Sequence, residues 1–225
     1  LCKRIIGGAA VSVDRRKFKR EGEAHRRDSL IAAAQELISE GGPTMATVRA
    51  IAERAGVTPG LIRHYFNSKE DLTRAAYHAL MAGMTEAHLV ALAFAPETPE
   101  ARLAAFVATS LRAPVMDPKA LGLWAGFIHL VRSDPDMQAV HADNYLRYRD
   151  LLQGLIAALP GAEPALLRAQ AIACNGILDG LWLEGCALPE AFDQDEMAQI
   201  GARAIGAILG VDLMQHLPPL AEQTA

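Results

Sequence analysis

The stretch IAERAGVTPGLIRHYFNSKEDL, which begins at Ile51, limits the folds open to this chain more than any other segment. Gly56 can take the left-handed backbone that a sharp turn between two helices needs. Ala52, four residues earlier, is small enough to let two helices cross closely. Thr58 is a common N-cap residue, and Pro59 occupies the favoured first position of a helix. This spacing predicts two short helices joined by a tight turn, which is the helix-turn-helix arrangement.

The remainder of the sequence also favours helices. Hydrophobic residues make up 51% of the chain and aromatic residues only 5%, which suits a helical core better than a sheet. Apolar residues recur at helical spacing between breaks rich in proline and glycine, without the alternation typical of strands. We therefore expect an all-α fold with helices at 25–42, 48–55, 59–65, 69–93, 97–112, 118–132, 135–159, 163–187 and 194–210.

Polar residues at two helix starts support these boundaries. Thr47 can cap the helix that follows it. Ser68, with Asp71 three residues later, resembles a capping box with a shorter acid in place of glutamate. The closing sequence HLPPLAEQTA cannot continue a helix through its proline pair, so residues 213–225 are expected to form a flexible tail.

Charge is divided unevenly along the chain, whose net charge is −4. Residues 1–75 contain 14 Lys and Arg against 9 Asp and Glu, whereas residues 76–225 contain 8 against 17. A basic N-terminal part joined to an acidic remainder is typical of a nucleic-acid-binding domain fused to a second domain with another role. The basic run RRKFKREGEAHRR is either a solvated tail or an arm that follows the DNA backbone or minor groove.

The cysteines and the apolar runs indicate the compartment. Cys2, Cys174 and Cys186 show no metal-binding spacing, and their odd number argues against a disulfide framework. No apolar run reaches the roughly 18 residues of a membrane span, and the opening residues do not resemble a signal peptide. We expect a cytoplasmic protein without cofactors that does not enter a membrane, with residues 1–22 as a loosely ordered extension.

The second helix of the helix-turn-helix suits the DNA major groove. Its small residues Pro59 and Gly60 allow close approach to base edges, and Arg63 is a long donor that can read guanine O6 and N7. Tyr65 and Lys69 follow at the helix end, where they can reach phosphates. Tyr65 can also pack its ring in the core while it offers its hydroxyl.

At this point the segment TVRAIAERAGVTPGLIRHYFNSKEDL, residues 47–72, resembles the tetracycline-repressor (TetR) family of transcriptional regulators. The resemblance implies a nine-helix, all-α homodimer on a pseudo-palindromic double-stranded DNA operator. It implies a DNA-binding domain at 23–70 and a ligand-binding and dimerisation domain at 71–212. The resemblance places Arg49, Pro59, Gly60 and Arg63 at bases, and Thr47, Thr58, His64, Tyr65 and Lys69 at phosphates. For Arg49, a solvated surface charge is as good an explanation as a contact to a base.

Two aromatic stretches indicate where a ligand can bind. LGLWAGFIHLVRSDPDM and CNGILDGLWLEG contain both tryptophans of the chain. Asp179 and Trp182 lie three apart on one helical face, and an acid beside an aromatic ring can bind a cation such as a quaternary ammonium. The alternative is that the aromatic residues are plain core and the acid bonds a neighbour. The candidate ligand-binding residues are Trp124, Phe127, Ile128, Asn175, Asp179 and Trp182, with Glu184 as a second acid.

The motifs ILDGLWL and LWAGF, within residues 120–210, look like the C-terminal domain of the choline-responsive betaine regulator (BetI-like) branch. This resemblance implies choline or a related amine as a candidate effector. Whether Tyr145, Tyr148 and Phe192 complete an aromatic cage stays open. We expect the effector to lie under the helix at 69–93, bordered by both tryptophans.

The last two predicted helices are rich in small and apolar residues. The sequence IGARAIGAILG would present a close-packing face with no later helix to cover it, which indicates a subunit interface. A four-helix bundle with two helices per subunit would cover this face. It would also set the DNA-contacting helices of the two subunits about 34–36 Å apart. The candidate dimerisation residues are Gly201, Ile205, Ile208 and Leu209.

The sequence thus predicts a ligand-responsive transcriptional regulator, most simply a repressor released by a small molecule. The alternatives are a regulator of unrelated metabolites and an enzyme that uses the helical pocket, although no catalytic or phosphate-binding signature occurs. His129 and His141, with acids between them, fit no compact metal motif, so no metal site is predicted. A DNA-binding architectural protein would leave the large C-terminal part unexplained.

Overall fold

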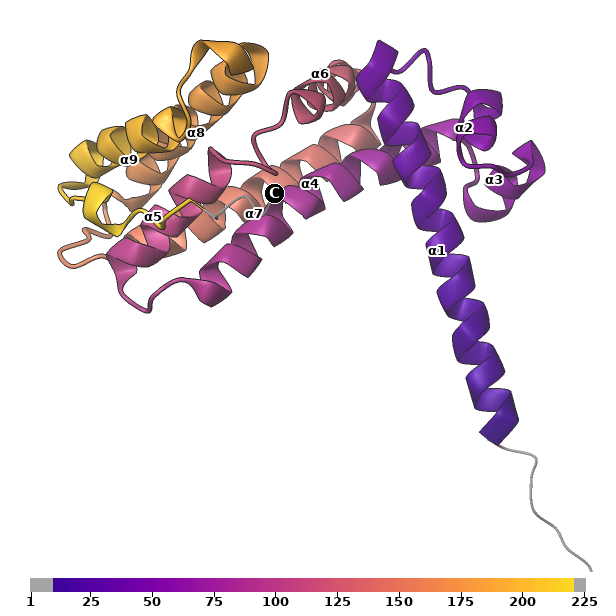
Figure 1. The fold of residues 1–225 in the computed structure, drawn as a ribbon, viewed down its shortest axis with the longest axis horizontal. Coiled ribbons are helices and arrows are strands. Elements are labelled where there is room, and N and C mark those ends of the chain that lie inside the picture. Colours follow the sequence, from indigo (N-terminus) through magenta and orange to yellow (C-terminus); the bar gives the residue numbers. More distant parts are fainter. Residues whose placement is uncertain (1–9, 221–225) are drawn as a thin grey trace, which may run out of the picture. The chain divides into compact units, whose positions relative to one another are not determined.

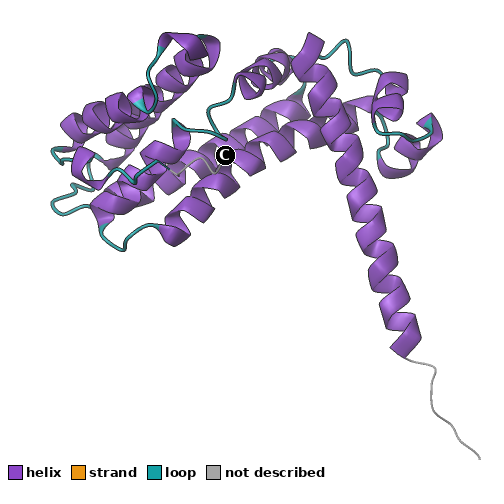
Figure 2. Cartoon of the chain, in the orientation of Figure 1, coloured by secondary structure: helices purple, strands orange, loops and turns teal. Residues whose placement is uncertain are grey.

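The computed structural model describes residues 10–220, with side chains from residue 22 onward. Within this range the chain is helical and contains no strand, as the sequence predicts (Figures 1 and 2). The helices are α1 (Ala10–Gly41), α2 (Val48–Arg54), α3 (Pro59–Tyr65), α4 (Lys69–Phe94), α5 (Pro99–Ser110), α6 (Pro118–Val131), α7 (Pro135–Ala157), α8 (Leu167–Ala187) and α9 (Glu196–Leu209), with the short 3-10 helices η1 (Pro189–Ala191) and η2 (Met214–His216).

The chain forms two compact units, Leu1–Ala76 and Tyr77–Ala225, and α4 runs through the division between them. We refer to them as the N-terminal unit and the C-terminal unit. None of the helices in the described part of the chain has the length and apolar character that crossing a membrane demands.

Helix α1 begins earlier than the sequence predicts. The sequence predicts a start at His25 and a loose segment at residues 10–22, yet the helix begins at Ala10. The added segment contains no proline and is rich in arginine and lysine, which are good helix formers. Gly22 is a single interruption, whose cost of about 1 kcal/mol a long helix can tolerate. The rest of the predicted extension, residues 1–9, lies outside the described residues.

The N-terminal unit packs the predicted apolar face of α1 against the helix-turn-helix. The shared apolar side chains are buried: Leu30, Ile31, Ala34, Leu37, Ile38, Ile51, Ala52, Ile62 and Phe66. The Arg27 guanidinium lies 5.1 Å from the centre of the Phe66 ring, in cation–π contact.

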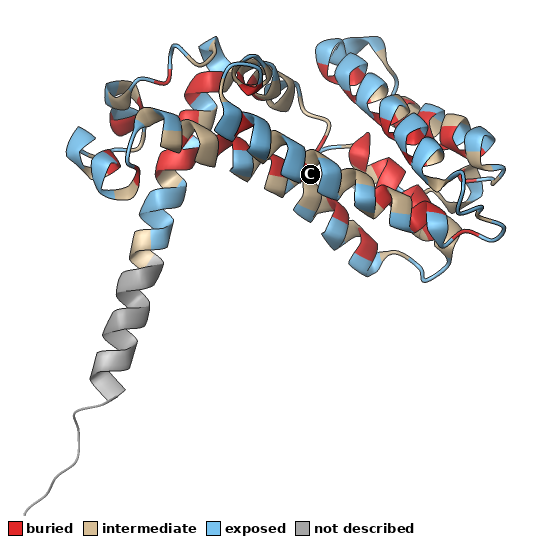
Figure 3. Cartoon of the chain, turned by 180° about the vertical axis from the view of Figure 1, so that it is seen from behind, coloured by how far each residue is buried: buried red, intermediate tan, exposed pale blue. Residues whose placement is uncertain are grey.

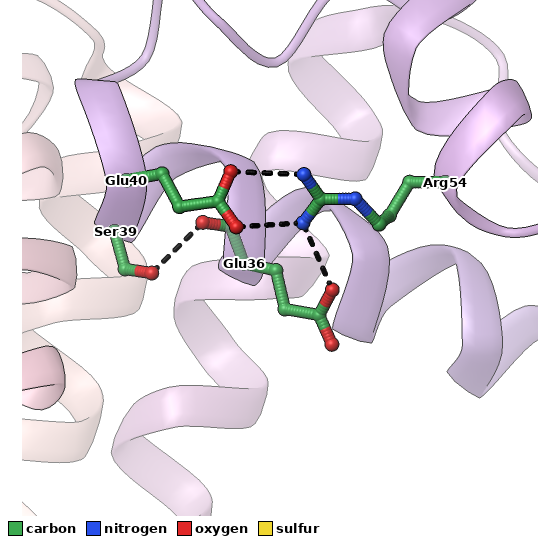
Figure 4. Close-up of polar contacts among 4 residues, drawn as sticks. All are labelled: Glu36, Ser39, Glu40 and Arg54. Atoms are coloured by element: carbon green, nitrogen blue, oxygen red, sulfur yellow. Dashed lines mark hydrogen bonds and ion pairs between the residues drawn. The ribbon is translucent and has the colours of Figure 1, made fainter.

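An exposed arginine ties α2 to α1 (Figure 4). Both Nη atoms of Arg54 donate to the Glu40 carboxylate at 2.8 Å, and Nη1 also donates to Glu36 Oε2 at 3.1 Å. The hydrogen bond from Arg54 lowers the pKa of Glu40. Because the paired groups are solvent-exposed, we regard this bridge as fixing the orientation of α2 more than as adding stability.

Helix α5 forms the centre of the C-terminal unit. Eight of its twelve residues are buried, including Leu103, Phe106 and Val107, and none is exposed (Figure 3). Helices α7, α8 and α9 pack against it. A helix with so little exposed surface needs such neighbours around most of its circumference.

The chain end is better fixed than the sequence predicts. Arg112 donates to both carboxylate oxygens of Asp195 at 2.6 and 2.8 Å, and to the Pro218 carbonyl at 2.9 Å. Leu213 is buried in the core, and η2 contacts α5 and α9. Residues 213–218 therefore pack on the unit, because the proline pair that ends a helix does not prevent packing. Residues 221–225 lie outside the described part.

Close packing between α9 and the end of α5 leaves no room at Gly201. A Cβ atom there would lie 2.4 Å from Leu111 Cδ1 and 3.3 Å from Val107 Cγ1. We therefore expect Gly201→Ala to reduce the free energy of unfolding by about 1–3 kcal/mol, as overpacking does. Gly154→Ala is the control, because the added methyl group meets no atom within 4 Å. Urea unfolding of both variants checks this, and an unaffected Gly201→Ala would contradict the packing.

Candidate functional site

The turn before α3 has the predicted geometry. Gly56 has a φ of 65°, in the left-handed region. The Val57 amide donates to the Ala52 carbonyl at 2.9 Å, which closes the turn. Thr47 caps α2, since its hydroxyl accepts from the Ala50 amide at 3.1 Å. Thr58 occupies the predicted N-cap position of α3. Its side chain makes no capping hydrogen bond, so that part of the prediction is wrong.

Helix α3 buries Ile62 and presents its other side to solvent. Most predicted DNA-contacting side chains are exposed: Thr47, Arg49, Thr58, Pro59, Gly60, Arg63 and His64. Tyr65 and Lys69 are half-buried. These residues share the helix-turn-helix and the start of α4, so the surface is available to a duplex.

The start of α4 is held by the predicted capping residues. The Asp71 amide donates to Ser68 Oγ at 3.1 Å, and the Asp71 carboxylate accepts from the Asn67 amide at 3.1 Å. This is a capping box shifted by one residue, because the shorter acid reaches the residue before the N-cap. Lys69 Nζ donates to the Pro43 carbonyl at 3.4 Å, which leaves the ammonium further donors for a phosphate.

A cavity of about 430 Å³ lies within the C-terminal unit. Helices α4, α5, α6, α7 and α8 and the segment after α5 all contribute to its wall. The lining residues are Met81, Met84, Thr85, His88, Ser110, Val115, Trp124, Ile128, His141, Tyr145, Tyr148, Leu178, Asp179, Gly180, Trp182 and Leu183. This mostly apolar wall with a few polar groups is typical of small-molecule sites.

One end of the cavity carries a carboxylate. The Tyr145 hydroxyl donates to Asp179 Oδ2, and Asn175 Nδ2 donates to both Asp179 Oδ2 at 2.8 Å and Tyr145 Oη at 2.6 Å. His141 stacks on Tyr145 with ring centres 5.5 Å apart. The negative charge is therefore oriented by two donors and bordered by aromatic rings.

Burial changes the acidity of these groups. Although Asp179 is reached by solvent, the surrounding protein raises the pKa of its carboxyl group above the ordinary value. The Tyr145 and Asn175 hydrogen bonds and the nearby His141 oppose that rise only in part. Burial also raises the pKa of Tyr145, to about 12, so its hydroxyl stays protonated and able to donate.

The other polar group of the wall is a neutral chain of hydrogen bonds. His88 is fully buried, and its Nδ1 donates to the Met84 carbonyl at 2.7 Å. Its Nε2 lies 2.8 Å from Ser110 Oγ, which lies 2.8 Å from the Tyr148 hydroxyl. Burial lowers the pKa of His88, so the ring is neutral and Nε2 accepts from Ser110.

Both tryptophans border the cavity, as the sequence predicts. Their ring centres lie 6.1 Å apart with an interplanar angle of 76°, an edge-to-face arrangement. Trp182 Nε1 donates to the Val115 carbonyl at 2.8 Å, which fixes the indole ring. Four of the six candidate residues line the cavity: Trp124, Ile128, Asp179 and Trp182.

The other candidates have different places. Phe127 is fully buried core packed on Tyr77, with ring centres 4.9 Å apart, so its predicted role at the ligand is wrong. Asn175 lies behind Asp179 and orients it. Glu184 is exposed and does not line the cavity, and Phe192 packs against the core instead.

Several lining residues were missed. Met81, Met84, Thr85 and His88 form one stripe of α4, and the predicted position of the site under this helix agrees with that stripe. Its helical spacing was visible in the sequence, but the same spacing describes plain core. Tyr145 and Tyr148, left open in the sequence, both line the cavity. Within the described range, no group of three or more histidine, cysteine or acidic side chains could hold a metal ion.

The candidate dimerisation residues of α9 divide into two groups. Ile205 is 0% exposed and Gly201 is buried, so both pack inside their own subunit and cannot meet a partner. Their assignment to the interface is wrong, because α5 and α8 cover that face of α9. Ile208 is 40% exposed and Leu209 is half-buried.

The raised pKa of Asp179 makes a prediction for stability. A carboxyl group whose pKa is higher in the folded chain destabilises the fold as pH rises from its unfolded pKa through the folded value. Asp179→Asn should therefore raise Tm at pH 7, and the gain should shrink as pH falls toward about 4, the ordinary aspartate pKa. Thermal unfolding across pH checks this, with exposed Asp150→Asn as the control. A constant gain at every pH would contradict the assigned cause.

Comparison with known families agrees with both sequence resemblances. Residues 30–76 match the bacterial regulatory proteins of the tetR family, and residues 99–210 match the BetI-type transcriptional repressor, C-terminal family. The HTH-type transcriptional regulator BetI of Serratia proteamaculans is 32% identical over 196 residues, which cover 86% of this chain and 96% of that protein. BetI 1 of Chromohalobacter salexigens is 30% identical and covers 78% and 86% respectively.

Solved structures share the fold. A transcriptional regulator from Pseudomonas aeruginosa PAO1 has a TM-score of 0.77 at 30% identity, covering 86% of this chain and 95% of that one. A regulator from Saccharomonospora viridis, solved in complex with choline, has a TM-score of 0.68 at 18% identity, covering 81% and 96%. These relatives are regulators, which removes the enzyme alternative. The chain belongs to the TetR family of DNA-binding transcriptional regulators, in its BetI-type branch, and is not an enzyme.

Proposed function

We propose that this protein is a homodimeric repressor that leaves a pseudo-palindromic DNA operator when a quaternary ammonium compound, or another small amine, occupies the cavity of the C-terminal unit. Choline is the first candidate. The observation that carries this proposal is the Asp179 carboxylate at a wall that also contains Trp124, Trp182, Tyr145 and Tyr148. The proposed compartment is the cytoplasm, because a repressor must reach its DNA operator.

The cavity has the chemistry that a cation needs. A quaternary ammonium cannot donate a conventional hydrogen bond, so it is held by aromatic faces and by a fixed negative charge. The described wall offers both, with Asp179 already oriented by Tyr145 and Asn175. A bound cation would favour the ionised carboxylate and thereby lower the pKa that burial raises. The structure of the Saccharomonospora viridis regulator with choline, which shares the fold, supports choline as the first probe.

Helix α4 provides the proposed route from cavity to DNA. Met81, Met84, Thr85 and His88 of α4 line the cavity, and the same continuous helix begins at Lys69 beside the helix-turn-helix. An effector shifts the equilibrium only by its different affinity for the DNA-competent and DNA-incompetent arrangements. We place that difference in the contacts to α4, whose displacement would change the spacing of the two reading helices.

Dimerisation is assigned to the exposed faces of α8 and α9 in place of the buried residues of α9. Ile172 and Leu183 on α8, and Ile200 and Ile208 on α9, are exposed large apolar side chains on helices that pack side by side. Exposed large apolar side chains on two paired helices favour an interaction site there.

The DNA surface yields the first functional prediction. Arg63→Ala should reduce discrimination at one base pair per half-site by about 1–3 kcal/mol, because a bidentate contact to guanine is lost. Lys69→Ala should weaken binding to operator and random DNA alike, and should lower the log–log salt slope by about one per lost phosphate contact. Fluorescence anisotropy with both duplexes at several salt concentrations separates these effects. Equal losses on both duplexes for Arg63→Ala would reassign Arg63 to the backbone.

The effector site yields the second functional prediction. Choline should quench or shift the fluorescence of the two cavity tryptophans, and it should release the protein from its operator. Asp179→Asn should weaken choline binding by at least tenfold, about 1.4 kcal/mol, because the fixed charge is lost. Glu184→Gln is the matched control, since this acid lies outside the cavity wall and should leave binding unchanged.

The pH dependence provides an independent readout of the same site. Choline affinity of the wild type should fall as pH decreases through the raised pKa of Asp179, because the neutral carboxyl group no longer attracts a cation. Asp179→Asn should lack this dependence. Binding of choline that is equal in wild type and Asp179→Asn would rule out the cationic site, whereas the regulator assignment would stand on its family.

A further inference from the structure

The cavity of the C-terminal unit is larger than choline. At about 30 Å³ for each non-hydrogen atom, the share of a molecule in liquid water, its volume of about 430 Å³ holds about 14 such atoms. Choline has about seven non-hydrogen atoms, so by the same measure it fills about half of the cavity. The other half must be taken up by water or by a further part of the ligand.

Much of the wall suits a hydrocarbon better than water. The apolar lining residues come from α4, α6, α8 and the segment after α5, and include Met81, Met84, Val115, Ile128 and Leu178. A buried water molecule needs about two to four polar partners, which these side chains do not supply. Methionine is flexible and polarizable, so its side chain can adapt to the shape of an apolar group. An apolar part of a ligand would therefore fill this space favourably.

Two hydroxyl groups of the wall have already used their hydrogens within the protein. His88 Nδ1 donates to the Met84 carbonyl, 2.7 Å away, because a carbonyl can only accept. The single hydrogen of the Ser110 hydroxyl serves either His88 Nε2 at 2.8 Å or the Phe106 carbonyl at 2.9 Å. Tyr148, whose hydroxyl lies 2.8 Å from Ser110 Oγ, must therefore be the donor in that pair. Neither hydrogen is available to a ligand.

The other two hydroxyl groups among the lining residues are used in the same way. Thr85 Oγ1 donates to the Met81 carbonyl at 3.2 Å, and the Tyr145 hydroxyl donates to Asp179. A ligand group that can only accept hydrogen bonds, such as a carboxylate, would therefore find no hydroxyl donor in this wall.

The charge of the wall is also one-sided. Asp179 supplies a carboxylate, and none of the residues that line the cavity is a lysine or an arginine. Burial lowers the pKa of both lining histidines, His88 and His141, which favours their neutral form. An anionic group on a ligand would lose its hydration without gaining a positive partner, and Asp179 would repel it.

We propose that the effector is a quaternary ammonium ion that carries an uncharged, apolar substituent of about six to ten carbon atoms, which the remaining volume can hold. The ammonium group binds at Asp179 beside the aromatic rings, and the substituent fills the space lined by Met81, Met84 and Ile128. This inference rests on the proposed effector site and narrows its ligand class to cationic amphiphiles.

A series of alkyltrimethylammonium ions tests the apolar part of the site. Each methylene group that becomes buried should lower Kd by about two- to fourfold. The gain should end near about ten carbons, where the cavity is full. Tryptophan fluorescence titration from the ethyl to the dodecyl compound, below micelle formation, measures this, and the concentration that releases the operator should fall in parallel. A Kd that does not change with chain length would overturn the proposal.

Met84→Phe and Ile128→Phe test where the chain lies. Each larger side chain takes up space in the cavity, so the advantage in Kd of the octyl over the ethyl compound should shrink by about tenfold. Met45→Phe is the matched control and should keep the full advantage, because Met45 is 52% exposed and lies in the N-terminal unit. Circular dichroism checks that all three variants fold. An unchanged advantage in both cavity variants, or an equal loss in the control, would contradict the placement.

The charge of the substituent is tested with a hexyltrimethylammonium analogue whose chain ends in a carboxylate. It should bind at least about tenfold more weakly than the uncharged compound of similar size. Equal binding of the two would refute an uncharged substituent.

The same titrations separate this inference from the proposed function. Binding of choline without any gain from longer chains would overturn the inference alone. If neither choline nor any member of the series binds, the proposed effector class itself is wrong.

Discussion

The burial of α5 is the constraint on which the C-terminal unit depends. Leu103, Phe106 and Val107 are each 0% exposed, so the surrounding helices must cover most of the helix. A buried helix also requires partners for any polar group it carries. The Ser110 hydroxyl meets this need because the Phe106 carbonyl, His88 Nε2 and the Tyr148 hydroxyl all lie within hydrogen-bond distance of it. The polar part of the cavity wall at His88, Ser110 and Tyr148 therefore follows from the need to give the buried Ser110 hydrogen-bond partners.

The two polar groups of the cavity have different physical characters. The chain through His88 is buried and neutral, so it can fix the orientation of a ligand but cannot attract its charge. Asp179 lines the cavity and is reached by solvent, and burial raises the pKa of its carboxyl group while the hydrogen bonds from Tyr145 and Asn175 oppose that rise. An unfavourable carboxylate is the kind of group that a protein retains for binding at a cost in stability.

Local chemistry could be predicted from the sequence, whereas the partner of each apolar face could not. The turn at Gly56 and the Thr47 cap depend on residues within a few positions, and both are present as predicted. Ile205 was assigned to a subunit interface because the pattern of an amphipathic helix does not say whether its own core or another chain covers it. Likewise, the α4 stripe and Phe127 have the same helical spacing, yet one borders the cavity and the other is core.

The glycines of α8 illustrate how the structure resolves that ambiguity. Each glycine inside a helix costs about 0.5–1 kcal/mol relative to alanine, so each one raises the question of what it accommodates. Gly185 has an answer inside the subunit, because a Cβ atom there would lie 2.6 Å from Met116 Sδ. Gly176 and Gly180 have no such neighbour, since an added Cβ atom would meet nothing within 4 Å. No contact within the described subunit explains Gly176, whereas Gly180 lines the cavity, where a larger side chain would take up space.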